Sequence, residues 1–172
     1  VDPSSSKSYT NYHKLSEVAS LMRNCYISGH TVVKVKSGTY SDSAYFSNIN
    51  GLSSNSTLTI DGGSSSSTKI IGSKNVMLGF EEASYITVKN LYIENNNTTT
   101  TTKVALTFTG NITDITVDSC SIKAPVNSNN YYVYDLSFAN IFKGGQGVVN
   151  NVTVSNTKFS GGYMGVYFPG DY

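Results

Sequence analysis

The chain contains the stretch Ile86-Thr-Val-Lys-Asn-Leu-Tyr-Ile93, which returns without a gap as Ile115-Thr-Val-Asp-Ser-Cys-Ser-Ile122 and Val152-Thr-Val-Ser-Asn-Thr-Lys-Phe159. The starts of the three copies lie 29 and 37 residues apart. A second repeated stretch interleaves with the first, at Val76–Phe80, Val104–Phe108, Leu136–Phe138 and Met164–Phe168. We therefore expect two strands to recur in each unit, and self-similarity at such an interval is typical of a solenoid.

Each repeat has the pattern of short β-strands rather than of helices. Apolar residues alternate with polar ones over about three to five positions, between clusters of Asn, Gly and Ser. Less exact copies at Val32–Val35 and Leu58–Ile60 extend the ladder upstream. The frame of leucine-rich repeats is missing, and propeller blades would need four strands in about 40 residues. The sequence therefore predicts an all-β fold, a parallel β-helix of about five to six coils spaced by about 4.8 Å.

The gap-free alignment also predicts which side chains stack from coil to coil. Two columns face inward (Ile86, Ile115, Val152 and Val88, Val117, Val154), a threonine column faces outward (Thr87, Thr116, Thr153), and a polar column lies at a turn (Asn90, Ser119, Asn156). Such a polar column can satisfy turn backbone groups that lack sheet partners. The same alignment stacks Asp118 on Lys89 and Lys123 on Glu94, which predicts two ion pairs between neighbouring coils.

Residues 11–24 are the one stretch with helical spacing. Its apolar residues fall on one face (Tyr12, Leu15, Val18, Ala19, Met22), and Thr10 could cap its start. An amphipathic helix laid over the end of a β-helix would cover apolar core and unpaired strand edge. We expect a single domain over residues 9–172, with the cap helix at 11–24 and the coils at 31–172, and this domain could be one part of a longer protein. Residues 1–8 are expected to be a linker or a short leftover segment that precedes the domain.

Composition excludes several classes of partner. Twelve Lys and Arg residues against eleven Asp and Glu leave a net charge of +1, so no basic footprint for nucleic acid exists. No run of about 18 apolar residues is present, so no membrane insertion is expected. Charged residues are only 13% of the chain, and the surface predicted from the remaining polar residues is rich in hydroxyl and amide groups. We expect a secreted or cell-surface protein, with Cys25 and Cys120 both free and buried.

The order of motifs from Thr57 to Phe168 resembles pectin-lyase-like β-helices, and polysaccharide lyase family 1 in particular. The likeness lies in Thr68-Lys-Ile-Ile-Gly72, followed by Ala83-Ser-Tyr-Ile-Thr-Val-Lys-Asn-Leu-Tyr-Ile93 and by Ile115–Ile122. The segment Lys14-Leu-Ser-Glu-Val18, together with Val32–Tyr40, resembles the cap and first coil of alginate-lyase relatives. The resemblance implies a right-handed β-helix that acts on or binds polysaccharide. It specifies the fold more strongly than the activity.

The resemblance also implies where a lyase site would lie. Family 1 lyases bind calcium through clustered carboxylates and abstract a proton with an arginine, which would give Asp118 and Asp135 catalytic or calcium-binding roles. This sequence departs from the family at Ser119, where the family has histidine, and at Gly161–Gly165, where it has His-x-x-Lys. The arginine segment would lie beyond Tyr172. Calcium prefers six to eight oxygen ligands, and no cofactor other than calcium is expected.

Two further groups are candidates for chemistry or binding. A lyase without arginine could use Lys143 or Lys158 as its base, with a nearby tyrosine as its acid. The loop from Ala124 to Asp135 lengthens the third unit, and insertions in solenoids often form the binding face. The predicted substrate-binding residues are Asn129, Asn130, Tyr131, Tyr132 and Tyr134 in this loop and Tyr163 downstream. The competing interpretation is an ordinary solvated loop whose tyrosines pack on the coil.

Three functions follow from these features. The first is a non-catalytic module that binds glycan or spaces the other domains of a larger secreted, polysaccharide-degrading or cell-surface protein. The second is a small pectate-lyase-like enzyme that cleaves acidic polysaccharide by β-elimination. The third is an adhesin whose partner is a protein.

Overall fold

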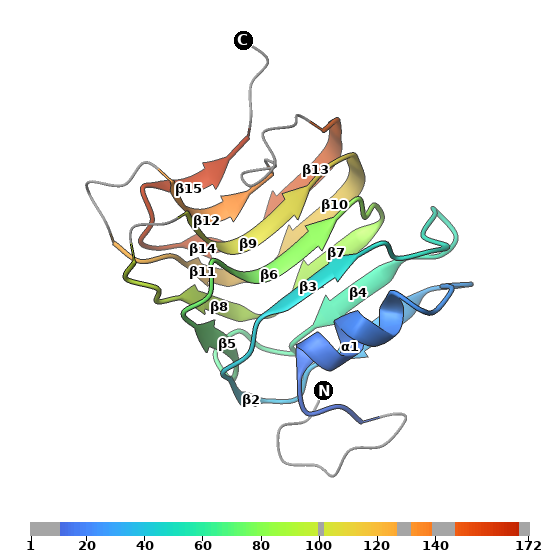
Figure 1. Cartoon of the computed structure of the whole chain (residues 1–172), viewed down its shortest axis with the longest axis horizontal. Helices are drawn as coiled ribbons and strands as arrows, with labels where there is room; N and C mark the ends of the chain where they lie inside the picture. Colours follow the sequence, from blue (N-terminus) through green and yellow to red (C-terminus); the bar gives the residue numbers. More distant parts are fainter. Residues whose placement is uncertain (1–10, 100–101, 127–131, 139–146, 169–172) are drawn as a thin grey trace.

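In the computed structural model, which describes residues 11–99, 102–126, 132–138 and 147–168, the chain winds into a right-handed parallel β-helix (Figure 1). Each of five coils contributes one strand to each of three parallel five-stranded sheets. The predicted fold is thereby confirmed. The expectation of two strands in each coil is wrong, because each coil holds three.

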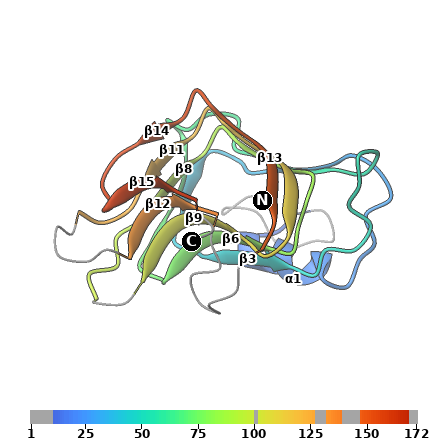
Figure 2. The same ribbon diagram turned by 90° about the horizontal axis from the view of Figure 1, so that it is seen from above.

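The three sheets surround one interior (Figure 2). Sheet 1 contains β1 (Thr31–Lys34), β4 (Leu58–Asp61), β7 (Ile86–Lys89), β10 (Ile112–Asp118) and β13 (Val149–Ser155). Sheet 2 contains β2 (Gly38–Tyr40), β5 (Thr68–Gly72), β8 (Tyr92–Asn95), β11 (Ser121–Lys123) and β14 (Lys158–Phe159). Sheet 3 contains β3 (Ala44–Ser47), β6 (Val76–Glu81), β9 (Lys103–Thr109), β12 (Val133–Ser137) and β15 (Met164–Tyr167).

The register of sheet 1 confirms the predicted columns. Ile115 pairs with Ile86 on one side and with Val152 on the other, and Val117 likewise lies between Val88 and Val154. The threonine column forms in the same ladder. The inward columns are fully buried in the middle coils and become partly exposed in the last coil.

Phenylalanine rings form a continuous stack inside sheet 3. Phe46, Phe80, Phe108, Phe138 and Phe168 follow one another with centroid separations of 5.1, 5.0, 5.5 and 4.5 Å. The register of β3, β6 and β9 accounts for the stack, because it places these residues at equivalent positions in successive coils. In this sheet the strict alternation of strands is interrupted, since the consecutive residues Ala105 and Leu106 both belong to the core.

The helix α1 (Leu15–Met22) covers the end of the core next to β3. Its buried residues are Leu15, Val18, Ala19 and Met22, four of the five predicted for its apolar face. It is shorter than the predicted 11–24, because Lys14 is extended and serves as N-cap without a side-chain hydrogen bond. Thr10, the predicted cap, lies outside the described residues. Asp42, from the connection between β2 and β3, instead accepts a hydrogen bond of 3.0 Å from the Ser16 N–H.

Both cysteines are free, as expected, but only Cys120 is buried. Cys25 is exposed in the segment that follows α1, so its predicted burial is wrong. Among the described residues, no helix has the length and apolar character that crossing a bilayer would take.

Candidate functional site

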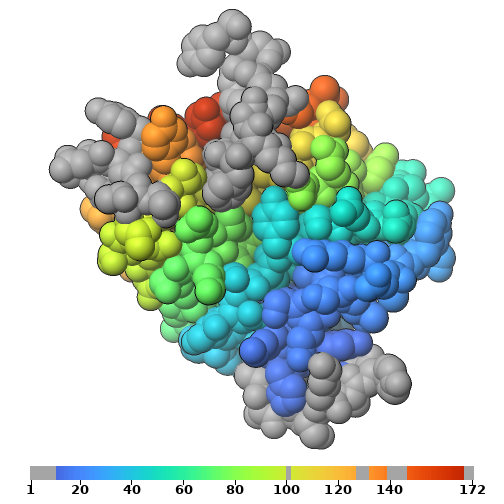
Figure 3. Space-filling model, in the orientation of Figure 1, coloured from blue at the N-terminus to red at the C-terminus, as the bar shows by residue number. Residues whose placement is uncertain are grey.

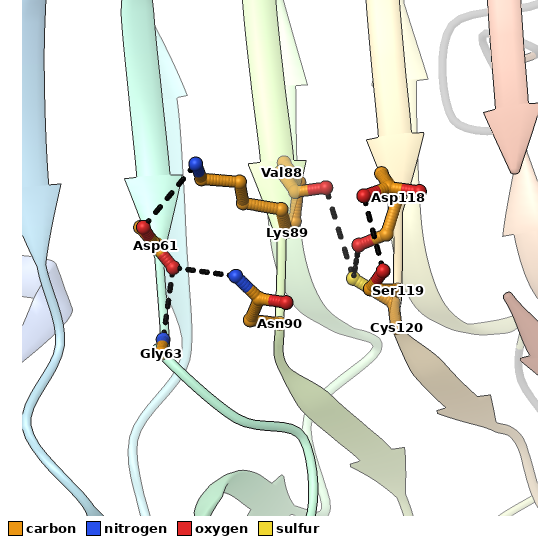
Figure 4. A network of polar contacts seen from close by, with 8 residues as sticks. All are labelled: Asp61, Gly63, Val88, Lys89, Asn90, Asp118, Ser119 and Cys120. Atoms are coloured by element: carbon orange, nitrogen blue, oxygen red, sulfur yellow. Dashed lines mark hydrogen bonds and ion pairs between the residues drawn. The ribbon is translucent and has the colours of Figure 1, made fainter. Parts of the chain in front are cut away.

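The predicted polar column lies at the turn between sheets 1 and 2 (Figure 4). Asn90, Ser119 and Asn156 adopt left-handed backbone conformations, with φ values of 58°, 53° and 48°. Asparagine tolerates this conformation better than most residues with side chains. The Asn90 side chain donates a hydrogen bond of 2.9 Å to Asp61 in the preceding coil, and Asn156 does the same to Asp118. The column therefore joins neighbouring coils through side-chain amides and carboxylates.

Asp118, the first catalytic and calcium candidate, is engaged in this turn network. Its carboxylate accepts hydrogen bonds from the Ser155 hydroxyl at 2.7 Å, from the Asn156 amide at 2.9 Å and from the Ser119 hydroxyl at 3.0 Å. The bond from Ser155, followed by those from Asn156 and Ser119, holds the pKa of the Asp118 carboxyl below its ordinary value. A carboxylate with three such donors connects two coils, which is a structural role.

One predicted ion pair forms and the other does not. Lys123 Nζ lies 2.8 Å from Glu94 Oε1, as predicted. Lys89 is in register with Asp118 but pairs with Asp61 in the coil on its other side, at 3.4 Å. The prediction failed because the register offers Lys89 two aspartates, one on each side, and Asp118 is already bonded to the following coil.

Asp135, the second candidate, lies in the interior and not at the surface. Tyr134 pairs with Val104 and Leu136 with Leu106, so Asp135 takes the register position of Ala105, a core residue. Its side chain accepts a hydrogen bond of 2.5 Å from the Ala124 N–H through Oδ1, while Oδ2 is buried without a partner. Burial raises the pKa of the Asp135 carboxyl to about 6, although the backbone N–H groups of Ala124 and Ser160 offset part of the effect.

The structure does not bring the two aspartates together. Asp118 ends β10 in sheet 1, whereas Asp135 belongs to β12 in sheet 3. No cluster of three or more His, Cys, Asp or Glu side chains that could hold a metal ion occurs within the described ranges. The carboxylate cluster that the lyase resemblance implies is therefore not assembled by these residues.

Four tyrosines lie on or next to the last two strands of sheet 3, and we call Tyr132, Tyr134, Tyr163 and Tyr167 the tyrosine surface. The rings of Tyr134 and Tyr167 stack with centroids 4.7 Å apart and planes 13° from parallel. Tyr134 is buried, whereas Tyr132 and Tyr163 are 61% and 43% exposed. The Tyr163 N–H donates to the Val133 carbonyl at 2.8 Å, which fixes the Tyr163 backbone beside β12. The stacked pair thus consists of a buried ring and a half-buried ring, and Tyr132 and Tyr163 are the exposed rings of this surface.

The other predicted site residues fall elsewhere. Asn129, Asn130, Tyr131 and Lys143 lie outside the described residues. Lys158 is exposed at the start of β14 in sheet 2, on a different sheet from the tyrosine surface. Cys120 is buried, and burial raises the pKa of its thiol to about 11, which makes it a poor nucleophile.

Sequence reasoning missed a second polar cluster, on the outer face of sheet 2. The Tyr92 hydroxyl donates a hydrogen bond of 2.7 Å to Glu94 Oε2, while Lys123 holds Oε1 of the same carboxylate. Lys69 Nζ lies 5.9 Å from the centre of the Tyr92 ring. Burial and the bond to Glu94 raise the pKa of Tyr92 to about 12. The repeat already predicted that Lys123 stacks on Glu94, but only the register shows that Lys69 lies beside Tyr92 and completes the cluster.

Comparison with known proteins shows similarity at the level of the fold. No protein-family profile matches this chain, and no curated protein matches it significantly. A pectin methylesterase variant solved in complex with a hexasaccharide is similar with a TM-score of 0.55 and 13% identity, over 87% of this chain and 65% of that one. A second complex of pectin methylesterase with a hexasaccharide has a TM-score of 0.47 and 14% identity, over 87% of this chain and 65% of that one. Pectin methylesterase from Yersinia enterocolitica has a TM-score of 0.45 and 13% identity, over 80% of this chain and 54% of that one.

The chain therefore spans slightly less than two thirds of the first of these structures. At this level of identity the similarity concerns the β-helix alone. It does not single out polysaccharide lyase family 1.

Proposed function

We propose that this protein is a secreted or cell-surface β-helix module that binds polysaccharide through the tyrosine surface and lacks a complete catalytic centre. The observation that carries the proposal is the pair of exposed rings, Tyr132 and Tyr163, beside the stacked pair Tyr134 and Tyr167. Tyrosine offers a large apolar ring with a polar hydroxyl, which suits the apolar faces and hydroxyl groups of a sugar. The neighbouring fold that was solved with a bound hexasaccharide is consistent with such a ligand.

Local order adds to the case. The Tyr134 and Tyr167 rings are held against each other, and Tyr163 is anchored through its backbone to Val133. Binding to a surface that is already ordered costs little conformational entropy. In the same part of the molecule, the interior carboxyl of Asp135 is 1% exposed and cannot reach a ligand on the outside.

Binding of polygalacturonate, alginate and fully methyl-esterified pectin, measured by isothermal titration calorimetry, tests the proposal. We expect Tyr132→Ala combined with Tyr163→Ala to weaken binding about tenfold, which corresponds to about 1.4 kcal/mol. Tyr26→Ala is the matched control, because Tyr26 is 75% exposed and lies near the end covered by α1. Absence of binding to all three glycans, or an equal loss in the Tyr26 variant, would contradict the proposal.

The alternative is a small pectate-lyase-like enzyme, which the motif order from Thr68 to Ile122 favours. It would need a base beside a tyrosine acid. Tyr92, whose ring centre lies 5.9 Å from Lys69 Nζ, has a pKa raised to about 12 and is a weak acid near neutral pH. Incubation with polygalacturonate and with alginate, with and without calcium, decides between the two. Growth in absorbance of an unsaturated product would establish the lyase, and its absence alongside measurable binding supports the module.

A further inference from the structure

The three sheets differ in charge. The strands of sheet 2 contain three lysines and one glutamate, a net charge of +2. The strands of sheet 1 contain two lysines and three aspartates, and those of sheet 3 contain one lysine, one glutamate and one aspartate, so each has a net charge of −1. Among the strand residues, net positive charge therefore occurs on sheet 2 alone.

The lysines of sheet 2 all point away from the core. Alternation along β5, β8 and β11 buries Ile70, Ile93 and Ile122 and leaves the residues between them at the outer face. One outer column reads Lys69, Tyr92, Ser121 and Lys158 from β5 to β14. Three strand spacings separate its two lysines, which is about 14 Å along the solenoid axis. Lys123 stands in the adjacent outer column, beside Glu94.

The one acidic residue in the strands of sheet 2, Glu94, already has two partners. Glu94 accepts from Lys123 at 2.8 Å and from the Tyr92 hydroxyl at 2.7 Å, so both carboxylate oxygens are occupied. Burial acts to raise the pKa of Glu94, but the hydrogen bonds from Lys123 and Tyr92, together with the charges of Lys123 and Lys69, keep this pKa below its ordinary value, so the carboxylate stays ionised and holds both partners. Glu94 thus orders Tyr92 and Lys123. Its single charge, which also attracts Lys69, leaves the strands of sheet 2 with a net charge of +2.

We infer that the outer face of sheet 2 is a second glycan-binding surface, which binds the carboxylates of a linear acidic polysaccharide that lies along the solenoid axis. The inference rests on the proposed function for the class of partner and adds to it the acidic character of the ligand. An extended polyanion that follows the axis meets Lys69 and Lys158 in turn, with the Tyr92 ring and the Ser121 hydroxyl between them. The spacing of the coils makes this surface linear, which suits a linear polymer better than a compact ligand.

Substitution of the two outer lysines tests the inference. We expect Lys69→Gln combined with Lys158→Gln to weaken polygalacturonate binding about tenfold at low salt, with the difference shrinking at 0.5 M salt as screening increases. Binding of fully methyl-esterified pectin, which carries no carboxylates, should be unchanged. Lys14→Gln combined with Lys34→Gln removes the same charge from the capped end and from sheet 1, and should have little effect.

A gain of affinity provides an independent measurement. Ser121 lies between Tyr92 and Lys158 in the outer column, so Ser121→Lys adds a cation at the middle of the surface and should strengthen polygalacturonate binding several-fold at low salt. This result would support the inference even if the double variant failed to fold.

Three outcomes would overturn the inference. They are unchanged polygalacturonate binding in the sheet 2 variants, an equal loss in the Lys14 and Lys34 control, and equally tight retention of single-stranded DNA, which would indicate a cation patch without preference for sugar. If the tyrosine variants lose binding while the sheet 2 lysine variants do not, the inference fails and the proposed function stands.

Discussion

A carboxyl group placed inside a solenoid couples folding to pH. Asp135 is 1% exposed and replaces the small or apolar residues found at the same register position in the neighbouring coils, Ala105 and Met77. Its Oδ2 has no partner, so the ionised form is disfavoured in the folded protein. The folded-state pKa of about 6 exceeds the ordinary value of 3.8. The favourable contribution of protonated Asp135 to the free energy of unfolding is therefore fully present below about pH 4, declines as pH rises, and is lost above about pH 6.

Asp135→Asn should remove this dependence. The free energy of unfolding of the variant relative to the natural protein should rise by roughly 3 kcal/mol between pH 4 and pH 8, from urea denaturation followed by circular dichroism. Carboxyls with lowered pKa, such as Asp61 and Glu94, change stability in the opposite direction, but they do so equally in both proteins. A difference between the two proteins that stays constant across this pH range would show that Asp135 keeps its ordinary pKa.

The turn between sheets 1 and 2 depends on a backbone that most side chains avoid. Asn90 has φ of 58° and donates a hydrogen bond to Asp61. We expect Asn90→Ala to lower the free energy of unfolding by about 1 to 2 kcal/mol, because alanine is strained in the left-handed region and loses the bond. Asn90→Gly separates the two causes, since glycine accepts the conformation. It should cost about 1 kcal/mol less than alanine, and equal losses would locate the whole effect in the hydrogen bond.

At the scale of elements, the strands were predictable where the repeat is contiguous. The columns of sheet 1 and the stacked phenylalanine residues of sheet 3 follow from gap-free copies in the sequence. The third strand of each coil was missed because β7 and the first two residues of β8 lie within one continuous repeat, Ile86–Ile93. The left-handed turn at Asn90 divides that repeat into two strands on different sheets. Asparagine within a strand-like run carried the signal for this division.

Features that depend on distant contacts were beyond the sequence. The start of α1 at Leu15 is set by Asp42, which lies 26 residues from the Ser16 N–H that it accepts. The cluster on sheet 2 joins residues from β5, β8 and β11, and alternation alone does not say which residues of other coils flank them. Of the predicted binding residues, Tyr132 and Tyr163 are exposed, whereas Tyr134 serves as a buried base for Tyr167. Burial of a tyrosine depends on what packs over it, which a local pattern does not contain.

At the scale of the whole molecule, the described residues of the first and last coils differ in burial. In a solenoid each coil contacts only its neighbours, so an end coil lacks half of the contacts of a middle coil unless another element replaces them. The helix α1 supplies four buried apolar residues at the first end. In the last coil, Val149, Val152, Phe159 and Val166 are only partly buried. Stability should therefore decrease from the capped end toward the last coil.

The phenylalanine stack allows this gradient to be measured with one substitution at three positions. Phe108→Ala, in the middle coil, should cost about 3 to 5 kcal/mol, because the ring is fully buried between Phe80 and Phe138. Phe168→Ala should cost about 1 to 2 kcal/mol, because that ring is 50% exposed. Phe46→Ala is the control, since Phe46 stacks on one ring only but is fully buried at the end covered by α1. If burial beneath α1 decides the cost, Phe46→Ala will lower the free energy of unfolding, measured by urea denaturation, by as much as Phe108→Ala does. If the number of stacked neighbours decides the cost, Phe46→Ala will cost only as much as Phe168→Ala, and the role assigned to α1 would be wrong.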